Sequence, residues 1–390
     1  DSNNNIKVKT LLGPGPSNVH PRVYSAMTTP ILSHLDPQLW SIMDETVELL
    51  RETFQTENKV TLPISGTGMA GMETAISNAI QPGETIIVGV HGFFANRLVE
   101  VAERCEANVV KIQTEWGKAV SPERVEKELK LHNDAKVVAI VHCETSTGVL
   151  QPLEEIARIT RKHGALLLVD SVASLGGHDL PVDSLGIDIC YTGSQKVLSC
   201  PPGMAPITFS PRALEAIKAR KVPPRSWYLD IQLLEQYWVS DRKYHHTVSA
   251  SLIYALRESL RILLEEGLTQ SFSRHKLNGK ALRAGIESMG LQLVAAPAVR
   301  ADTLNGVLVP EGLDADKIRS ILMDDYNIET GGGLGDLKGK LIRIGLMGQS
   351  SKESNVLMIL SALERILQSQ GFEIPKSAGV TAAHSVYSGN

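Results

Sequence analysis

Between residues 60 and 210, short apolar runs alternate with segments whose apolar residues recur at helical spacing. This alternation is typical of parallel α/β proteins. The run at residues 166–169 has no polar position, which indicates a strand covered on both faces. The apolar runs predict strands at residues 60–64, 85–90, 108–112, 136–141, 166–170, 187–192 and 204–209. We therefore expect an α/β fold built on a mostly parallel, seven-stranded sheet.

The segments outside this region predict three further parts of the chain. Residues 11–17 hold too many prolines and glycines for a helix or a central strand, so we expect an ordered arm there. Asp36-Pro37 is typical of a helix start. A helix-rich stretch at 249–289 leads into shorter elements, and the small, polar residues after Lys376 predict a loosely ordered tail. The expected organisation is an arm at 1–20, a large domain at 21–267, a smaller C-terminal α+β domain at 268–374 and a tail at 375–390.

Composition excludes several classes of function. The 390 residues include 39 Lys and Arg against 43 Asp and Glu, a net charge of −4. Without a basic run, this balance predicts no nucleic-acid partner. No apolar run approaches the roughly 18 residues of a membrane helix, so we expect no membrane contact. The four cysteines lack zinc-type or CxxC spacing and indicate free thiols of an intracellular protein. We expect the cytoplasm, with the peroxisome and the mitochondrion as alternatives.

A glycine-rich loop follows the first predicted strand. Residues 65–71 read Ser-Gly-Thr-Gly-Met-Ala-Gly, and a helix after such a loop offers free amide groups to an anion. A glycine-rich turn without a ligand is the alternative. The letters also satisfy the G-x-G-x-x-G pattern of nicotinamide-dependent dehydrogenases. That class needs an acidic residue after the next strand, but this strand ends in Val90-His91. We therefore consider a dehydrogenase the weaker interpretation.

Asp170 and Lys196 each follow a predicted strand, so both are expected at the edge of the sheet where ligands bind. A carboxylate at the end of an apolar strand needs a cationic partner, and a pyridinium nitrogen would be one. A lysine in a tight site can have a lowered pKa, which suits Schiff-base chemistry. Taken singly, Asp170 could be a loop-anchoring residue and Lys196 a solvated surface charge. Their common edge favours one cofactor site.

Two further patterns concern substrate and metal. In the predicted strand around Arg343, alternation places this guanidinium on the face opposite Ile342 and Ile344, where it could grip a carboxylate through two hydrogen bonds. An arginine on a solvated strand face is the alternative. His245 and His246 could suggest a metal site. Neighbouring side chains diverge on a strand or helix, and no other cluster has ligand spacing, so we predict no metal.

At this point the sequence resembles a known family over residues 11–368. The motifs that carry the resemblance are Leu12-Gly13-Pro14-Gly15-Pro16-Ser17, Glu144-Thr145-Ser146-Thr147-Gly148, Val169-Asp170-Ser171-Val172-Ala173-Ser174, Gly193-Ser194-Gln195-Lys196, Tyr244-His245-His246-Thr247 and Leu341-Ile342-Arg343-Ile344-Gly345. They resemble the alanine–glyoxylate and serine–pyruvate aminotransferases, class V aminotransferases of PLP fold type I. The resemblance implies pyridoxal 5'-phosphate as cofactor and a homodimer with shared active sites.

The resemblance also implies roles for individual residues. Lys196 would form the Schiff base and move the proton in catalysis, and Asp170 would pair with the pyridine nitrogen. The other implied cofactor contacts are Thr67, Gly68, Met69 and Gln195 at the phosphate, Phe94 at the ring, Thr145 at the ring hydroxyl, and Tyr244 and Thr247 from the neighbouring subunit. The implied substrate contacts are Gly15, Thr145 and Arg343. Relatives often have His in place of Met69 and Trp in place of Phe94, which leaves cofactor affinity open.

The expected reaction is transfer of the amino group of L-alanine or L-serine to glyoxylate or pyruvate, by a ping-pong route through pyridoxamine phosphate. An (S)-ureidoglycine–glyoxylate aminotransferase is an alternative, although those enzymes have Asn-Tyr where this chain has Trp227-Tyr228. A 3-hydroxykynurenine transaminase is another. Gln195 stands where cysteine desulfurases have His, which argues against desulfuration. The sequence does not rank the donors or acceptors.

Overall fold

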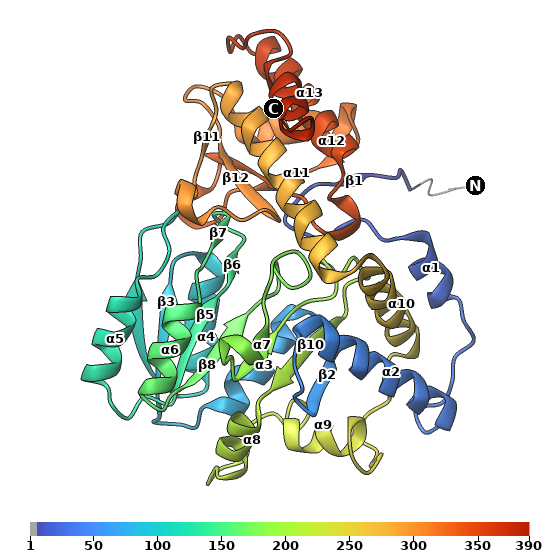
Figure 1. Cartoon of the computed structure of the whole chain (residues 1–390), viewed down its shortest axis with the longest axis vertical. Coiled ribbons are helices and arrows are strands. Elements are labelled where there is room, and N and C mark those ends of the chain that lie inside the picture. The colour runs from blue at the N-terminus through green and yellow to red at the C-terminus, as the bar shows by residue number, and fades with distance from the viewer. Residues whose placement is uncertain (1–5, 390) are drawn as a thin grey trace.

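The structure is a computed structural model that describes residues 6–389. The first five residues of the predicted arm and Asn390 of the predicted tail lie outside the described residues. Buried apolar side chains form two large clusters, one within residues 23–263 and one that joins Leu12 to residues 281–383. Figure 1 shows the first as the lower, blue-to-yellow part of the molecule and the second as the upper, orange-to-red part.

The lower part is built on the predicted seven-stranded sheet. Its strands, in sheet order, are β2 (Val60–Ser65), β10 (Met204–Phe209), β9 (Ile189–Tyr191), β8 (Leu166–Asp170), β5 (Val137–Val141), β3 (Thr85–Val90) and β4 (Asn108–Gln113). Each lies within a few residues of its predicted position. β10 is antiparallel to both neighbours, while the pairs from β9 to β4 are parallel. The sheet is therefore mostly parallel, as predicted, and β2, β8 and β9 have their carboxyl ends at the same edge.

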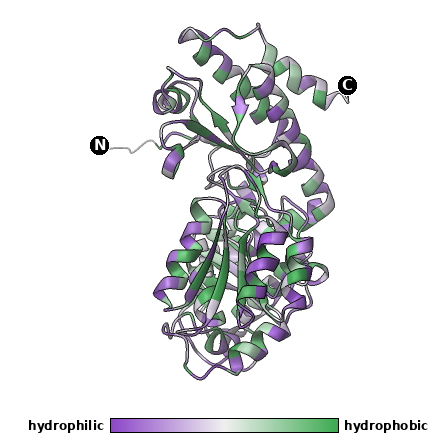
Figure 2. Ribbon diagram, turned by 90° about the vertical axis from the view of Figure 1, so that its left-hand side faces the viewer, coloured by the Kyte–Doolittle hydropathy of each residue, from purple (hydrophilic) through white to green (hydrophobic). Residues whose placement is uncertain are grey.

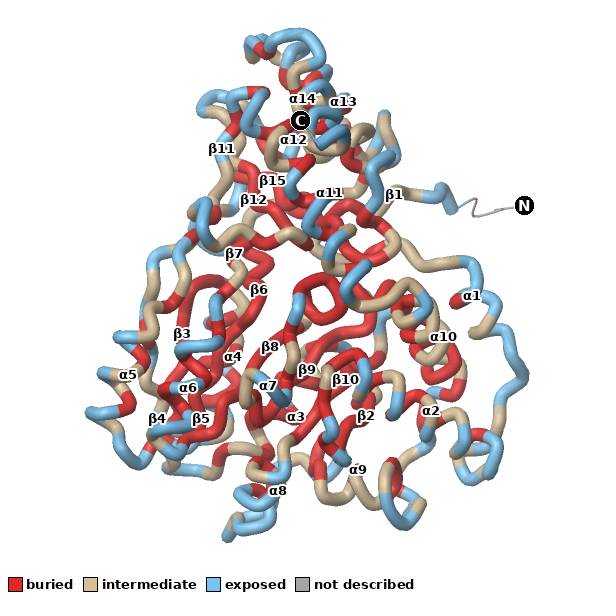
Figure 3. Tube along the Cα trace, in the orientation of Figure 1, coloured by how far each residue is buried: buried red, intermediate tan, exposed pale blue. Residues whose placement is uncertain are grey.

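Helices cover both faces of this sheet (Figure 2). The helices of the lower part are α1 (Pro21–Met27), α2 (Pro37–Phe54), α3 (Gly68–Ala79), α4 (Phe93–Arg104), α5 (Pro122–Leu131), α6 (Glu154–Lys162), α7 (Val182–Leu185), α8 (Pro211–Lys218), α9 (Ile231–Trp238) and α10 (Ala250–Glu266). α2 begins as predicted, because Asp36 Oδ1 accepts the Gln38 amide at 2.7 Å ahead of Pro37. β3, β5, β8 and β10 are buried at every position, which explains their unbroken apolar runs (Figure 3).

The upper part is α+β, as predicted. Its antiparallel sheet has the order β11 (Gln292–Leu293), β12 (Leu304–Leu308), β15 (Leu341–Gly345) and β14 (Gly331–Gly332). Its helices are α11 (Leu268–Ser288), α12 (Ala315–Asp325), α13 (Glu353–Ser369) and α14 (Ala378–Tyr387). α10 and α11 follow one another, confirming the helix-rich stretch, and α11 leads into the upper part (Figure 1).

The prediction of a loosely ordered tail is wrong for most of its length. Residues 378–387 form α14, and Ala383 is fully buried in the second cluster. The Oδ1 atom of Asn278, on α11, accepts the hydroxyl of Tyr387 at 2.7 Å. Small residues such as Gly379 allow this close packing, since a Cβ there would lie 3.1 Å from Met289 Sδ. The small side chains that suggested disorder are thus the ones that let α14 pack.

The arm is ordered, as predicted, and it ties the two parts together. Its strand β1 (Thr10–Leu11) pairs in parallel with β13 (Ile328–Glu329), and Leu12 is fully buried in the second cluster. Ser17 Oγ then donates to the carbonyl of Lys196 at 2.6 Å. The arm therefore runs from the upper part to the edge of the large sheet. Across residues 6–389, no helix is both long and apolar enough to cross a membrane.

Candidate active site

One cavity opens at the edge of the large sheet where β2, β5 and β8 end. Its volume is about 560 Å³, counting space open to solvent. The predicted site residues in its wall are Thr67, Gly68, Met69, Phe94, Thr145, Asp170, Gln195 and Lys196. The remaining wall residues are Met72, Val141, Cys143, Val172 and Ala173. Segments from five parts of the sequence thus converge here, as expected for the carboxyl ends of strands in an open α/β sheet.

Asp170, the last residue of β8, is buried in this wall. Its Oδ1 accepts the Val172 amide at 2.9 Å, and its Oδ2 accepts the hydroxyl of Tyr191 at 2.7 Å. Burial raises the pKa of Asp170 to about 6, while these two hydrogen bonds oppose the rise. Both oxygens are fixed in place, so the carboxylate is prepared to face a cation in the cavity.

Lys196 lies in the loop after β9 and is pinned by the arm. Its Nζ donates to the carbonyl oxygen of Pro14. Gly15 has φ of +107°, and a Cβ there would lie 2.4 Å from Lys196 Cδ, so only glycine leaves room for this side chain. Burial, followed by the nearby Arg343 charge, lowers the pKa of Lys196 to about 8. A substantial fraction of the amine is therefore neutral near pH 8.

The first turn of α3 forms another wall of the cavity. Thr67 is the N-cap residue, but its side chain makes no cap hydrogen bond, so the first amides of α3 have no side-chain partner. Gln195 also lines the cavity, and its buried Oε1 has no hydrogen-bond partner among the described residues. Rotating this amide would present its NH2 group instead. Helix amides and a side-chain amide donor together suit a phosphate group.

Arg343 stands beside the cavity rather than in its wall. It lies on β15 of the upper sheet and is 7% exposed. Its Nε donates to Gly332 O at 2.6 Å, and its Nη1 donates to Thr145 O at 3.3 Å. Burial lowers the pKa of Arg343 to about 10, so the guanidinium stays charged at neutral pH. The predicted strand alternation is confirmed, and Nη2 has no protein acceptor among the described residues.

The structure does not bring Tyr244 and Thr247 to the cavity. Both side chains are exposed, in a segment at 242–249 that belongs to no helix or strand. Exposed Trp227 and Tyr228 lie close by, and the Trp227 ring stacks on His245 with centroids 4.4 Å apart. Within one chain, these residues form an aromatic surface outside the cavity.

The expected geometry of His245 and His246 is wrong. We expected the two side chains to diverge, but their Nδ1 atoms lie 2.8 Å apart because the segment is irregular. His246 Nε2 lies 3.1 Å from Ser65 Oγ, so this ring packs against the large sheet. Within residues 6–389, no three His, Cys, Asp or Glu side chains are grouped so that they could hold a metal ion.

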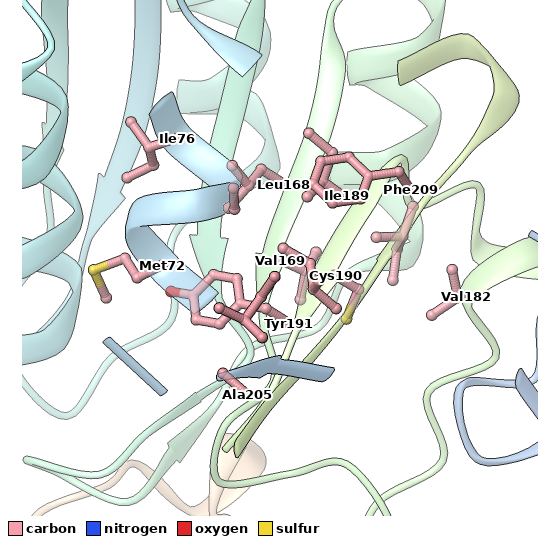
Figure 4. Packing of buried hydrophobic residues seen from close by; sticks show 14 of the residues in the cluster. Met72, Ile76, Leu168, Val169, Val182, Ile189, Cys190, Tyr191, Ala205 and Phe209 are labelled. Atoms are coloured by element: carbon pink, nitrogen blue, oxygen red, sulfur yellow. The ribbon is translucent and has the colours of Figure 1, made fainter. Parts of the chain in front are cut away.

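Sequence reasoning missed Tyr191, which holds Asp170. Its ring is fully buried among side chains of α3, β8 and β10 (Figure 4). Burial and the Asp170 charge raise the pKa of Tyr191, so the hydroxyl remains a donor at any ordinary pH. Tyr191 ends an otherwise apolar strand, where an aromatic residue reads as core. Its position two residues before the glycine of the lysine loop is the only sequence signal that could have identified it.

Comparisons with known proteins agree with this geometry. The family model for class V aminotransferases matches residues 19–344. An alanine–glyoxylate aminotransferase of Drosophila melanogaster is 41% identical, over 93% of this chain and 93% of its own. The solved ureidoglycine–glyoxylate aminotransferase of Bacillus subtilis has a TM-score of 0.95 and 41% identity, covering 98% of this chain and 99% of its own. The alanine–glyoxylate aminotransferase of Nostoc sp. has a TM-score of 0.90 and 44% identity, covering 94% and 99%.

These relatives share PLP fold type I, and class V aminotransferases use pyridoxal phosphate. The cavity fits that cofactor group by group. The α3 amides and the unpartnered Gln195 amide suit its phosphate, the buried Asp170 carboxylate suits its pyridine nitrogen, and the Lys196 amine lies in the same cavity. The fold, the site and the relatives agree that this chain belongs to the class V aminotransferases and takes pyridoxal phosphate as its cofactor.

Proposed function

We propose that this chain transfers the amino group of L-alanine or L-serine to glyoxylate, giving glycine, or to pyruvate. The observation that carries this proposal is the placement of Lys196 and Asp170 in one cavity with the Arg343 guanidinium beside it. The cavity is walled by short or apolar side chains such as Cys143, Val172 and Ala173, which suits small substrates.

When bound, pyridoxal phosphate supplies an electron sink for the bond to the substrate Cα. Asp170, whose two oxygens are fixed by Val172 and Tyr191, would hold the proton on the pyridine nitrogen. Lys196 acts first as the nucleophile and then moves a proton at Nζ, a task that its lowered pKa favours. In the cofactor-free chain, the carbonyl of Pro14 orients this amine.

Arg343 would bind the substrate carboxylate, which every donor and acceptor named here carries. Two of its nitrogens are committed to the carbonyls of Gly332 and Thr145, which fixes the plane of the guanidinium. A fixed plane lets the remaining N–H groups meet a carboxylate with little loss of entropy. Gly15 and Thr145 border the same space and would contact the substrate.

The homodimer is also part of this proposal. Tyr244 and Thr247 would complete the phosphate site of a neighbouring copy, since both are exposed and neither lies in the cavity wall of its own chain. The aromatic surface around Trp227 and Tyr228 would be covered in the same contact. Loss of activity in Tyr244→Ala with an unchanged monomer fold would support this arrangement.

The second candidate is (S)-ureidoglycine–glyoxylate transamination. The relatives that carry this name match the chain as well as the alanine–glyoxylate relatives do, at 41% identity and a TM-score of 0.95. Against it, Trp227 stands where such enzymes are expected to place an amide that reads the ureido group. Glyoxylate is an acceptor in both candidates.

The visible absorption spectrum of the purified protein tests both candidates. We expect a yellow cofactor band that L-alanine or L-serine bleaches and that glyoxylate restores. Bleaching by (S)-ureidoglycine alone would move the assignment to the second candidate. A protein that keeps its yellow band with all three donors would refute the proposed function.

A further inference from the structure

Glu144 is a fully buried carboxylate behind the cavity wall, and neither the cofactor nor the substrate contacts proposed above use it. It ends the short strand β6 (Cys143–Glu144), which pairs with β7 (Val149–Leu150). Its Oε1 accepts the amide of Phe94 at 3.2 Å, and its Oε2 accepts the amide of Ala95 at 3.0 Å. Ser146 also donates to Oε1, from its Oγ at 2.8 Å and from its amide at 3.2 Å.

This carboxylate makes no salt bridge within residues 6–389, although burying an unpaired charge is costly. Its charge is stabilised by amide donors and by the N-terminal end of α4, where helices favour negative charge. Gly92 makes the approach possible, because a Cβ at that position would lie 2.2 Å from Glu144 Cγ. The chain therefore keeps a costly charge and provides the space for it, which indicates a role beyond packing.

Glu144 connects two parts of the active site. On one side it holds the first turn of α4, which presents Phe94 to the cavity. On the other side the next residue, Thr145, accepts Arg343 Nη1 through its carbonyl oxygen at 3.3 Å. Burial lowers the pKa of Arg343, and the charge of Glu144 opposes that effect.

We propose that Glu144 is a positioning residue for transamination, which fixes the ring of Phe94 and the guanidinium of Arg343 relative to one another. The inference rests on the proposed function, in which Phe94 faces the cofactor ring and Arg343 binds the substrate carboxylate. If the two groups are held by one carboxylate, disturbing that carboxylate should weaken cofactor binding and substrate binding together. A residue that served only to stabilise α4 would not change the KM of either carboxylate substrate.

The test is Glu144→Gln, which keeps the shape but places an NH2 group against an amide donor. We expect kcat/KM to fall about 10- to 100-fold, with higher KM for both L-alanine and glyoxylate, as for a small misplacement of binding groups. The Kd of pyridoxal phosphate for the cofactor-free protein should rise several-fold. Amide exchange at residues 94 and 95 of the cofactor-free protein should accelerate, because one of their two hydrogen bonds to this side chain is lost.

Two other variants keep the proposal open to refutation. Ser146→Ala removes one hydroxyl that donates to Glu144 and accepts the Phe93 amide, and it should shift the same quantities less while folding normally. Glu123→Gln changes an exposed glutamate in the first turn of α5 and should shift none of them. A folded Glu144→Gln protein with unchanged KM values would overturn the proposal, even if exchange at residues 94 and 95 were faster. If the unmodified enzyme transaminates no donor, the proposed function fails, and an unchanged Kd for pyridoxal phosphate in Glu144→Gln would still overturn the positioning role.

Discussion

The proposed cofactor side of the cavity and the proposed carboxylate side are built in different ways. Asp170 ends β8 and Lys196 follows the neighbouring strand β9. The hydrogen-bond donors to Asp170 are Tyr191, within the first hydrophobic cluster, and Val172, which packs against it. Arg343 stands on the other sheet, and its two acceptors, Gly332 and Thr145, come from different parts of the molecule. The cofactor side is fixed within one core, whereas the carboxylate side depends on how two cores meet. Changes on the two sides should therefore separate cofactor affinity from substrate affinity.

The largest effect is expected for Lys196→Ala. Removing the amine removes both the proposed nucleophile and the group that moves the proton. A positioned proton-transfer group typically accelerates a reaction about 100- to 10,000-fold, so kcat should fall by at least that factor. The measurement is the rate of transamination, followed as the formation of glycine from glyoxylate. Lys196→Arg serves as the control that keeps a charge at this position. Undiminished turnover in Lys196→Ala would contradict the assignment of the site.

A large effect confined to substrate binding is expected for Arg343→Ala. Loss of a buried, charge-assisted partner costs about 2–5 kcal/mol, which should appear mainly as higher KM for donor and acceptor alike. The Kd of pyridoxal phosphate should change little, because Arg343 lies outside the cavity wall. Steady-state kinetics and a cofactor titration of the same preparation give both numbers. If Arg343→Ala weakened substrate binding and cofactor binding equally, the two sides of the cavity would not be independent.

We expect the affinity for pyridoxal phosphate to depend on pH through Asp170. Its pKa is raised to about 6, so the carboxylate is ionised above that pH and becomes protonated as the pH falls through it. Since the ionised form is the one that pairs with a pyridinium, affinity for pyridoxal phosphate should fall below pH 6, by up to about tenfold per pH unit. Asp170→Asn should bind more weakly at pH 8. It should retain only the pH dependence of the cofactor phosphate, whose second pKa is also about 6.

The smallest effect is expected for Tyr191→Phe, which removes one hydrogen bond to Asp170 and leaves the ring packing intact. A hydrogen bond to a charged group is worth about 1.5–3 kcal/mol, and Val172 still holds the other oxygen. We expect a roughly tenfold weaker affinity for the cofactor and an unchanged KM for glyoxylate. A change in KM for glyoxylate would show that Asp170 influences the carboxylate side.

The sequence predicted the large sheet well because its signal is local. Burial on both faces leaves an unbroken apolar run at 166–169, and the polar residue that ends such a run marks the edge where ligands bind. Asp170 and the glycine-rich loop before α3 were found in this way. The edge strand β4 was also predicted, although most of its positions are partly or fully exposed.

Contacts between distant segments were harder to predict. From the sequence, Tyr191 is indistinguishable from an ordinary core residue, and only the structure shows its hydroxyl donating to Asp170. Glu144 is likewise only part of a motif in the sequence, and the structure shows that it accepts amides of α4. The small residues of α14 suggested disorder because their packing partners lie about a hundred positions earlier on α11. The geometry of His245 and His246 depended on a regular backbone that the segment does not have.

The arm has a consequence for how the protein is made. Residues of the arm are synthesised well before their partners, since Pro14 meets Lys196 across 182 positions and Lys9 meets Asn327 across 318. The arm therefore cannot pair with β13, and so cannot take its final place beside Lys196, until residues 328–329 have been synthesised. Contacts of such long sequence separation form slowly, because the ends of a long loop must first find each other. Nascent chains stalled before residue 328 should consequently leave their arm open to protease, while the large sheet is already protected.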